Sequence, residues 1–160
     1  TCGRGGIVMR FCCWESPVGW LTLAEEEGAL VRTDFGKTAP EGQAEETPLL
    51  RQALTELSEY FSGKRREFTV PLRPAGTPFQ KKVWEELRRI PFGETRSYGE
   101  IAAALGNPRA GRAVGMANNK NPLPIWIPCH RVVGAGGKLV GYAGGLDVKE
   151  ALLRLEGVRL

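Results

Sequence analysis

The sequence predicts an α/β N-terminal domain with a short antiparallel sheet over residues 1–76, and a mostly helical, winged-helix-like C-terminal domain with a helix-turn-helix over residues 77–160. Three observations predict this fold class. Apolar and polar residues alternate in "GWLTLA" and "ALVRTDF", as in strands, whereas the apolar spacing after Thr77 is helical. The length of 160 residues, with 42% hydrophobic content, suffices for one core or two small units.

The N-terminal strands are expected in an antiparallel meander over residues 7–36, because "SPVG" and "EEEG" separate the apolar runs. The polar segment "GKTAPEGQAEETP" is expected to be a loop. A helix should follow, because apolar residues then recur at helical spacing until Gly63: Leu50, Ala53, Leu54, Leu57 and Phe61. "EFTVPLRPAG" predicts a last short strand and a linker.

Three helical signals follow Thr77. "TPFQ" predicts a capping box from Thr77 to Gln80. The apolar face of this helix is expected to hold Phe79, Val83, Leu87 and Ile90, before Pro91. "SYGE" repeats the capping box with Ser97 and Glu100, opening a short helix that ends at Gly106.

Asn107 and Pro108 are expected to cap the next helix, which contains "RAGRAVGMANN". Two short helices joined by a tight turn predict the helix-turn-helix. A final helix is expected from about Asp147 to Gly157, with three buried apolar residues: Ala151, Leu152 and Leu155.

Charge is unevenly distributed along the chain. The net charge is +4, and residues 101–146 carry no acidic residue but five basic ones: Arg109, Arg112, Lys120, Arg131 and Lys138. This segment would present a positive surface suited to a polyanion. A solvated loop face is the alternative interpretation.

The second helix of the pair has a smooth surface, with small residues at four positions: Ala110, Gly111, Ala113 and Gly115. Helices that enter the major groove usually carry long polar side chains. Two glycines within a helix each cost about 1 kcal/mol relative to alanine. Close approach to the DNA minor groove would offset this cost. Close packing against another helix would offset it equally well.

The only histidine, His130, directly follows Cys129 in "IPCHRVV". A reactive cysteine needs a base or a positive partner, and an imidazole is in turn oriented by a carboxylate. Glu156 is a candidate for that carboxylate, because the preceding basic segment contains none. The alternative is a buried structural cysteine beside a histidine that hydrogen-bonds the backbone.

The remaining cysteines indicate no disulfide or metal site. Cys12 and Cys13 are adjacent, and with Cys2 they lack a fourth ligand at a spacing suited to zinc. No signal peptide or transmembrane segment is predicted. An intracellular, cytoplasmic protein with reduced thiols is therefore expected.

Residues 77–157 resemble the O6-alkylguanine-DNA alkyltransferase family, also called methylated-DNA-protein-cysteine methyltransferases. The resemblance rests on "SYGEIAAALGNPRAGRAVGMANNKNP", "PIWIPCHRVV" and "VGYAGGLDVKEALLRLEG". Residues 1–76 match the variable N-terminal domain of that family only in size and pattern. The cysteine of "PCHRV" distinguishes the chain from the alkyltransferase-like proteins, which lack it.

The resemblance implies a role for each matching residue. Cys129 would accept the alkyl group, His130 would act as a base through a water, and Glu156 would hold His130. Asn121 would brace the turn before Cys129, and Tyr98 would donate a hydrogen bond to guanine.

DNA contacts are implied in the same way. Arg112 would enter the duplex in place of the flipped nucleotide. The small residues around it would approach the minor groove: Ala110, Gly111, Ala113 and Gly115. The pocket for the base would be lined by Tyr98, Val132, Tyr142, Ala143 and Gly144. Ala143 stands where other members have serine. Trp126 is bulkier than expected, and core packing is its default role.

The implied activity is repair of double-stranded DNA. The protein would flip O6-alkylguanine out through the minor groove and transfer the alkyl group irreversibly to its own cysteine, in one turnover. The resemblance implies no cofactor and no metal, and a monomer that acts in the cytoplasm, on the nucleoid when bound to DNA. Residues 77–160 would form the DNA-binding and alkyl-acceptor domain.

Two other classes share some of these features. A winged-helix regulator would use Cys129 as a redox sensor and would prefer a DNA sequence over a lesion. A cysteine hydrolase would use the same Cys-His-Glu set with turnover and without DNA.

Overall fold

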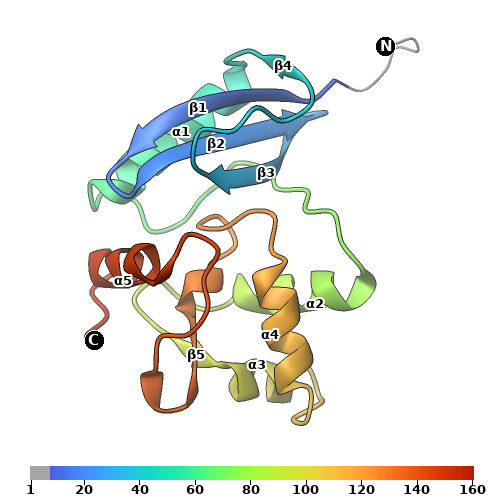
Figure 1. Cartoon of the computed structure of the whole chain (residues 1–160), viewed down its shortest axis with the longest axis vertical. Helices are drawn as coiled ribbons and strands as arrows, with labels where there is room; N and C mark the ends of the chain where they lie inside the picture. The colour runs from blue at the N-terminus through green and yellow to red at the C-terminus, as the bar shows by residue number, and fades with distance from the viewer. Residues whose placement is uncertain (1–7) are drawn as a thin grey trace. The chain divides into compact units, whose positions relative to one another are not determined.

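The computed structural model describes residues 8–160, and Cys2 lies outside them. The chain divides into two compact units, the N-terminal unit up to Pro74 and the C-terminal unit Ala75–Leu160. The first contains a sheet and one helix, and the second is mostly helical (Figure 1). The predicted fold class is therefore confirmed.

The N-terminal sheet has four strands in the order β3-β2-β1-β4. The antiparallel meander is as predicted: β1 (Arg10–Ser16), β2 (Gly19–Glu26) and β3 (Ala29–Phe35). The segment predicted as a plain loop contains β4 (Gln43–Ala44), which pairs in parallel with β1. The strand expected in "EFTVPLRPAG" is absent from the described residues, where Leu72 forms only an isolated bridge with Leu30.

Helix α1 (Pro48–Phe61) supplies the other half of this unit's core. Thr47 caps it by accepting a hydrogen bond from the Leu50 N–H. Its buried residues Leu50, Ala53 and Leu57 match the predicted helical face, but Leu54 and Phe61 are only partly buried, and Tyr60 is buried instead. The central strand β2 does not alternate between buried and exposed residues, because Thr22 on its other face is also buried under the chain after β3.

The C-terminal unit begins with α2 (Pro78–Leu87), whose Thr77–Gln80 capping box forms as predicted. The helix is shorter than its apolar pattern, and Ile90 is buried beyond its end. Phe79 was expected in the core but is exposed, and Trp84 is buried instead. The Trp84 Nε1–H donates to the Ala117 carbonyl at 2.9 Å. This bond explains how a polar indole atom can be buried there.

The helix-turn-helix consists of α3 (Tyr98–Ala104) and α4 (Gly111–Asn119), preceded by β5 (Arg96–Ser97). The Ser97–Glu100 capping box is confirmed. Asn107 and Pro108 do not cap α4, which begins three residues after Pro108 at Gly111, with Ala110 as its N-cap. The Ala110 N–H instead donates to the Asn107 carbonyl, so this pair belongs to the turn.

The rest of the unit is built from short elements and one helix. They are η1 (Cys129–Arg131), β6 (Val132–Val133), η2 (Ala135–Gly137) and α5 (Leu146–Leu155). Strand β6 pairs in parallel with β5. On α5, Leu152 is buried as predicted, but Ala151 is exposed and Leu155 is only partly buried. Lys149 and Leu153 occupy the buried face instead.

Candidate active site

Cys129 opens η1 at the end of a buried segment that follows α4. The Asn121 side chain fixes this segment by donating one hydrogen bond and accepting another. Its Nδ2 donates to the Ile127 carbonyl and its Oδ1 accepts from the Leu123 N–H, both at 2.9 Å. Between them, Ile125 has a φ of 77°, which is strained for a β-branched residue and costs of order 1–3 kcal/mol. The Asn121 hydrogen bonds stabilise the turn that contains this strained residue.

His130 and Glu156 form a buried pair. The His130 Nε2 lies 2.8 Å from the Glu156 Oε2, and neither side chain is exposed. Burial alone would raise the pKa of Glu156, but His130 and Arg131 outweigh it and lower that pKa to about 2. Glu156 is therefore ionised at neutral pH and orients the imidazole.

Arg131 is the second partner of this carboxylate. Its Nε lies 2.8 Å from the Glu156 Oε1 and its Nη2 3.0 Å from Oε2, a bidentate pair. Its Nη1 donates to the Ile90 carbonyl at 2.7 Å, just after α2. The sequence placed Arg131 on a basic surface, which is wrong, because it is buried and paired.

The imidazole of His130 is neutral at neutral pH. Burial lowers the pKa of His130, and the charges of Arg131 and Lys149 lower it further against the opposing effect of Glu156. With the Nε2 proton assigned toward Glu156, the other nitrogen, Nδ1, carries the lone pair. Among residues 8–160, this buried Nδ1 has no hydrogen-bond partner. Its lone pair is therefore available to accept a proton.

The thiol of Cys129 is only 5% exposed, and burial raises its pKa to about 11. The side chains of Asn121, Lys149 and Tyr142 act in the opposite direction. The pKa of Tyr98 is raised by burial and by the charge of Cys129. At neutral pH, the resting site therefore holds a protonated thiol, a protonated phenol and a neutral imidazole.

Lys149 extends from α5 into the same site. Its side chain is fully buried, and its Nζ donates to the Val132 carbonyl at 2.6 Å and to the Val140 carbonyl at 2.9 Å. Burial lowers the pKa of Lys149 to about 8, and Cys129 acts against this shift. The effects of Lys149 and Cys129 on each other's pKa place the two side chains in one electrostatic environment.

The segment Gly141–Gly145 lies between Val140 and α5. Its Gly145 N–H donates to the Tyr142 carbonyl at 3.0 Å, and Gly145 has a φ of 94°, which favours glycine. In the described part of the chain, no such bond engages the N–H of Ala143 or Gly144. Ala143 is exposed and Gly144 partly so, while the Val132 side chain is fully buried and its carbonyl binds Lys149.

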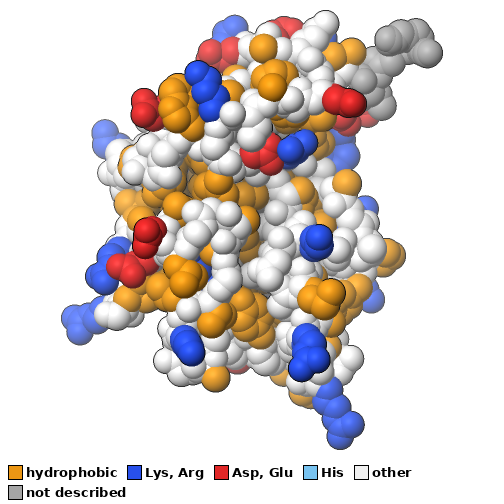
Figure 2. All heavy atoms as spheres, in the orientation of Figure 1, with side chains coloured by type: hydrophobic (Ala, Val, Ile, Leu, Met, Phe, Trp, Pro, Cys, Tyr) orange, Lys and Arg blue, Asp and Glu red, His pale blue; other side chains and the backbone are white. Residues whose placement is uncertain are grey.

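On α4, Arg112 and Ala113 are exposed, and Ala110 and Gly111 are partly exposed. A Cβ built on Gly111 would meet no atom within 4 Å, so helix packing does not explain this glycine. A Cβ on Gly115 would lie 3.6 Å from the Tyr98 ring, which is an ordinary van der Waals contact, so packing against Tyr98 does not require a glycine there. Figure 2 shows separate Lys and Arg side chains over the part of the C-terminal unit that contains α4.

Sequence reasoning missed Arg131 and Lys149 as site residues. Nothing in the sequence around Arg131 predicts its burial, because only the fold brings this residue to Glu156. The burial of Lys149 could have been predicted, because it precedes the buried Leu152 and Leu153 by three and four residues and so lies on the buried face of α5.

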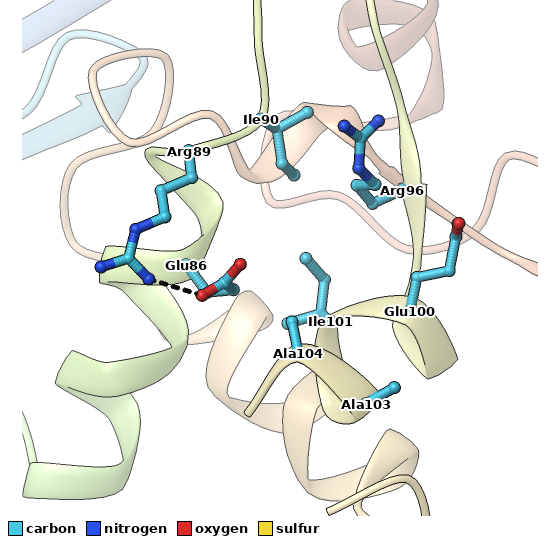
Figure 3. Close-up of a pocket in the computed structure, with 8 residues that line it drawn as sticks. All are labelled: Glu86, Arg89, Ile90, Arg96, Glu100, Ile101, Ala103 and Ala104. Carbon is cyan, nitrogen blue, oxygen red and sulfur yellow. Dashed lines mark hydrogen bonds and ion pairs between the residues drawn. The ribbon is translucent and has the colours of Figure 1, made fainter. Parts of the chain in front are cut away.

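A separate pocket lies between the end of α2, β5 and α3 (Figure 3). It is lined by Glu86, Arg89, Ile90, Arg96, Glu100, Ile101, Ala103 and Ala104. Arg89 pairs with Glu86 at 2.7 Å, and the Ser97 N–H donates to Glu100. Cys129 does not line this pocket.

The other described cysteines lie on β1. Cys12 and Cys13 are free, and burial, with smaller effects of Glu46 and Cys13, raises the pKa of Cys12 to about 11. Within residues 8–160, no group of three or more His, Cys, Asp or Glu side chains is arranged to hold a metal ion. No helix in that range is long and apolar enough to cross a membrane.

Comparisons with known proteins cover nearly the whole chain. Residues 9–74 match the family described as 6-O-methylguanine DNA methyltransferase, ribonuclease-like domain, and residues 78–158 match its DNA binding domain. The methylated-DNA–protein-cysteine methyltransferase of Methanosarcina acetivorans is 51% identical over 154 residues, covering 93% of this chain and 99% of that protein. The constitutive enzyme of Bacillus subtilis is 48% identical over 153 residues, covering 90% and 93%.

Solved structures show the same similarity. The O6-methylguanine methyltransferase of Mycobacterium tuberculosis aligns with a TM-score of 0.85 and 45% identity, covering 92% of each chain. The OGT of the same organism in complex with DNA aligns with a TM-score of 0.86 and 47% identity, also covering 92% of each chain.

The fold and the site define a class of protein: a DNA-binding protein whose helix-turn-helix unit carries a buried cysteine and a buried His-Glu pair. Within that class, the chain belongs to the 6-O-methylguanine DNA methyltransferase family. It is a methyltransferase that acts in DNA repair by alkyl transfer.

Proposed function

We propose that the protein extrudes O6-alkylguanine from duplex DNA through the minor groove and transfers the alkyl group to Cys129 in a single turnover. The observation that carries this proposal is a buried thiol, Cys129, followed directly in the chain by His130, a neutral, buried imidazole whose Nδ1 has no partner among the described residues. Such an arrangement provides a base for the thiol and excludes bulk water from the reaction.

The thiol proton leaves first. A water between the Cys129 Sγ and the His130 Nδ1 would pass the proton to the imidazole. Glu156, ionised and 2.8 Å from Nε2, stabilises the imidazolium that forms. The thiolate is the nucleophile, since a thiol is far less reactive.

The alkyl group is then transferred in line. The Sγ–carbon bond forms as the carbon–O6 bond breaks, and its electron pair stays on the guanine. Tyr98 is a protonated donor, and the N–H groups of Ala143 and Gly144 make no hydrogen bond among the described residues. These groups stabilise the charge that develops on the leaving base, which takes up one proton.

DNA engagement is assigned to α4. Its exposed small residues fit a groove roughly 6 Å wide, and Arg112 fills the space that the extruded nucleotide leaves. A damaged, weakly paired base costs least to unstack, which favours lesions over normal guanine.

The product is a thioether. Its carbon has no easy route to water, so Cys129 stays alkylated and each molecule reacts once. We place DNA binding and alkyl acceptance together in residues 77–160, in a protein that acts as a monomer in the cytoplasm and on the nucleoid when bound to DNA.

Intact mass spectrometry tests this proposal. After mixing with a duplex that contains one O6-methylguanine, the protein should gain the mass of one CH2 unit, because a methyl group replaces the thiol hydrogen, and peptide mapping should place that methyl group on Cys129. Cys129→Ser should bind the lesion and gain nothing. Cys12→Ser with Cys13→Ser is the matched control and should react as the wild type does. Methylation elsewhere, or repeated turnover, would contradict the proposal.

A further inference from the structure

We propose that Lys149 is a positioning residue for alkyl transfer: its buried ammonium group stabilises the Cys129 thiolate while its N–H groups hold the backbone on either side of the pocket. This inference rests on the function proposed above and deepens it. It concerns a residue that is neither the nucleophile nor its base.

The burial of the Lys149 ammonium group carries a cost in free energy. Lys149 is fully buried, and among the described residues no carboxylate forms an ion pair with it. A buried charge without a counter-ion is expensive, and lysine is seldom fully buried unless paired. Two carbonyl groups alone are a weak reason to retain a cation there, because a neutral amide could satisfy them at lower cost.

The titratable groups coupled to Lys149 are Cys129 and His130, both on η1, and His130 is paired with Glu156. Glu156 is already shared between His130 and Arg131. The Cys129 thiolate, which forms only during the reaction, is therefore the one anion in this group left for Lys149.

The hydrogen bonds of Lys149 also join two segments of the site. The two carbonyls that Lys149 binds belong to Val132, three residues after Cys129, and to Val140, just before the Gly141–Gly145 segment. One Nζ thus links the strand that follows the nucleophile to the segment whose Ala143 and Gly144 N–H groups are proposed to stabilise the leaving base. The cation is fixed in place before the reaction, so its favourable interaction with the thiolate requires no reorganisation.

Kinetics with free O6-benzylguanine test the inference without DNA binding. Lys149→Gln removes the charge and keeps two N–H donors for the carbonyls, whereas Lys149→Arg keeps the charge. Lys138→Met, at an exposed lysine of the same unit, is the matched control for loss of one positive charge. We expect Lys149→Gln to be slower near pH 7 by about tenfold or more, which corresponds to one pKa unit of thiolate stabilisation. The control should react at the wild-type rate.

The pH profile separates the charge from a merely structural role. Lys149 loses its proton as the pH rises through about 8, so the ratio of wild-type to Lys149→Gln rates should be largest below pH 8 and should fall above it. A ratio that is constant over this range, or a Lys149→Gln variant as fast as the wild type, would overturn the inference. If Lys149→Gln does not fold, Lys149→Arg, which keeps the charge, should react at a rate close to that of the wild type, and a loss of about tenfold or more in that variant would overturn the inference.

The same experiment separates two failures. If the wild type gains no benzyl group on Cys129, the proposed function itself fails. If the wild type reacts and the ratio does not change with pH, only the role of Lys149 fails.

Discussion

At the scale of single residues, the Glu156 carboxylate serves two partners: it orients the imidazole of His130 and neutralises the charge of Arg131. Glu156→Gln should slow the reaction with both duplex and free base, because it disturbs the imidazole that accepts the thiol proton. Removing one partner of a buried pair typically costs about 3–5 kcal/mol, so the variant should also unfold more easily.

The stability that Glu156 contributes to the folded protein depends on pH. The pKa of Glu156 is lowered in the folded protein from 4.5 to about 2, so its stabilising effect is complete above pH 4.5 and disappears as the pH falls toward 2. The difference in Tm between wild type and Glu156→Gln, followed by calorimetry, should narrow over that range. A gap that stays constant down to about pH 3 would remove Glu156 from the charge pair.

Substitution of Arg112 separates extrusion of the base from the alkyl transfer itself. Its side chain is exposed on α4, and the proposed function gives it no contact with the reacting atoms. Arg112→Ala should therefore slow repair of duplex DNA much more than reaction with free O6-benzylguanine. Equal losses on both substrates, measured by single-turnover kinetics, would place Arg112 in the pocket instead.

The same residues show where sequence reasoning reaches its limit. The Cys129, His130 and Glu156 set was predicted because a nucleophile, a base and a carboxylate have recognisable chemistry, and the structure brings His130 and Glu156 together. Arg131 and Lys149 were not identified, because a charged residue in a sequence is usually exposed. Their burial depends on tertiary partners that lie up to 41 residues away, such as Ile90 for Arg131.

Among the secondary-structure elements, the sharpest sequence predictions were the two capping boxes, Thr77–Gln80 and Ser97–Glu100. Both depend on residues three apart, so local sequence determines them. The start of α4 was predicted wrongly, because Asn107 and Pro108 form a turn that suits a helix N-terminus equally well. Helix ends that depend on tertiary context are the hardest to predict.

Substitution of Gly111 tests how closely α4 approaches the minor groove. A Cβ there would touch no atom of the protein, and the backbone is helical, so Gly111→Ala should keep the free energy of unfolding or raise it by up to about 1 kcal/mol. Its affinity for duplex DNA should nevertheless fall, because the added methyl group would separate α4 from the minor groove.

Fluorescence anisotropy with a labelled duplex measures this affinity, and urea unfolding measures the stability. Ala113→Gly is the control on the same helix, because it removes a methyl group instead of adding one. It should lower the free energy of unfolding but should introduce no clash that weakens DNA binding. Unchanged DNA affinity for Gly111→Ala would argue against close approach of α4 to the groove.

For the whole molecule, alkylation of Cys129 should lower stability. The thiol lies in a site with 5% exposure, and it loses its proton for a methyl group. Overpacking a tight site costs roughly 1–3 kcal/mol, and a buried donor left without a partner costs about as much. A loss near 2 kcal/mol would lower the Tm by several degrees in a protein of this size.

Asn121 connects this loss to DNA binding, because it links the end of α4 to the segment that leads to Cys129. The methylated protein should therefore bind duplex DNA more weakly than the free protein. Calorimetry and anisotropy on protein before and after one turnover measure both effects. Equal values for the two forms would show that the pocket accommodates the product and that Asn121 does not transmit the change.

His130 is the only histidine in the chain, which makes the site directly visible by nuclear magnetic resonance. Uniform ¹⁵N labelling gives a single imidazole ring, so its signals require no assignment by mutagenesis. The chemical shifts of its two nitrogens distinguish the Nε2–H tautomer, with a free Nδ1, from the imidazolium. Titrating lesion-containing DNA into such a sample would follow the base through binding, proton transfer and the alkylated product, one imidazole signal reporting each state in turn.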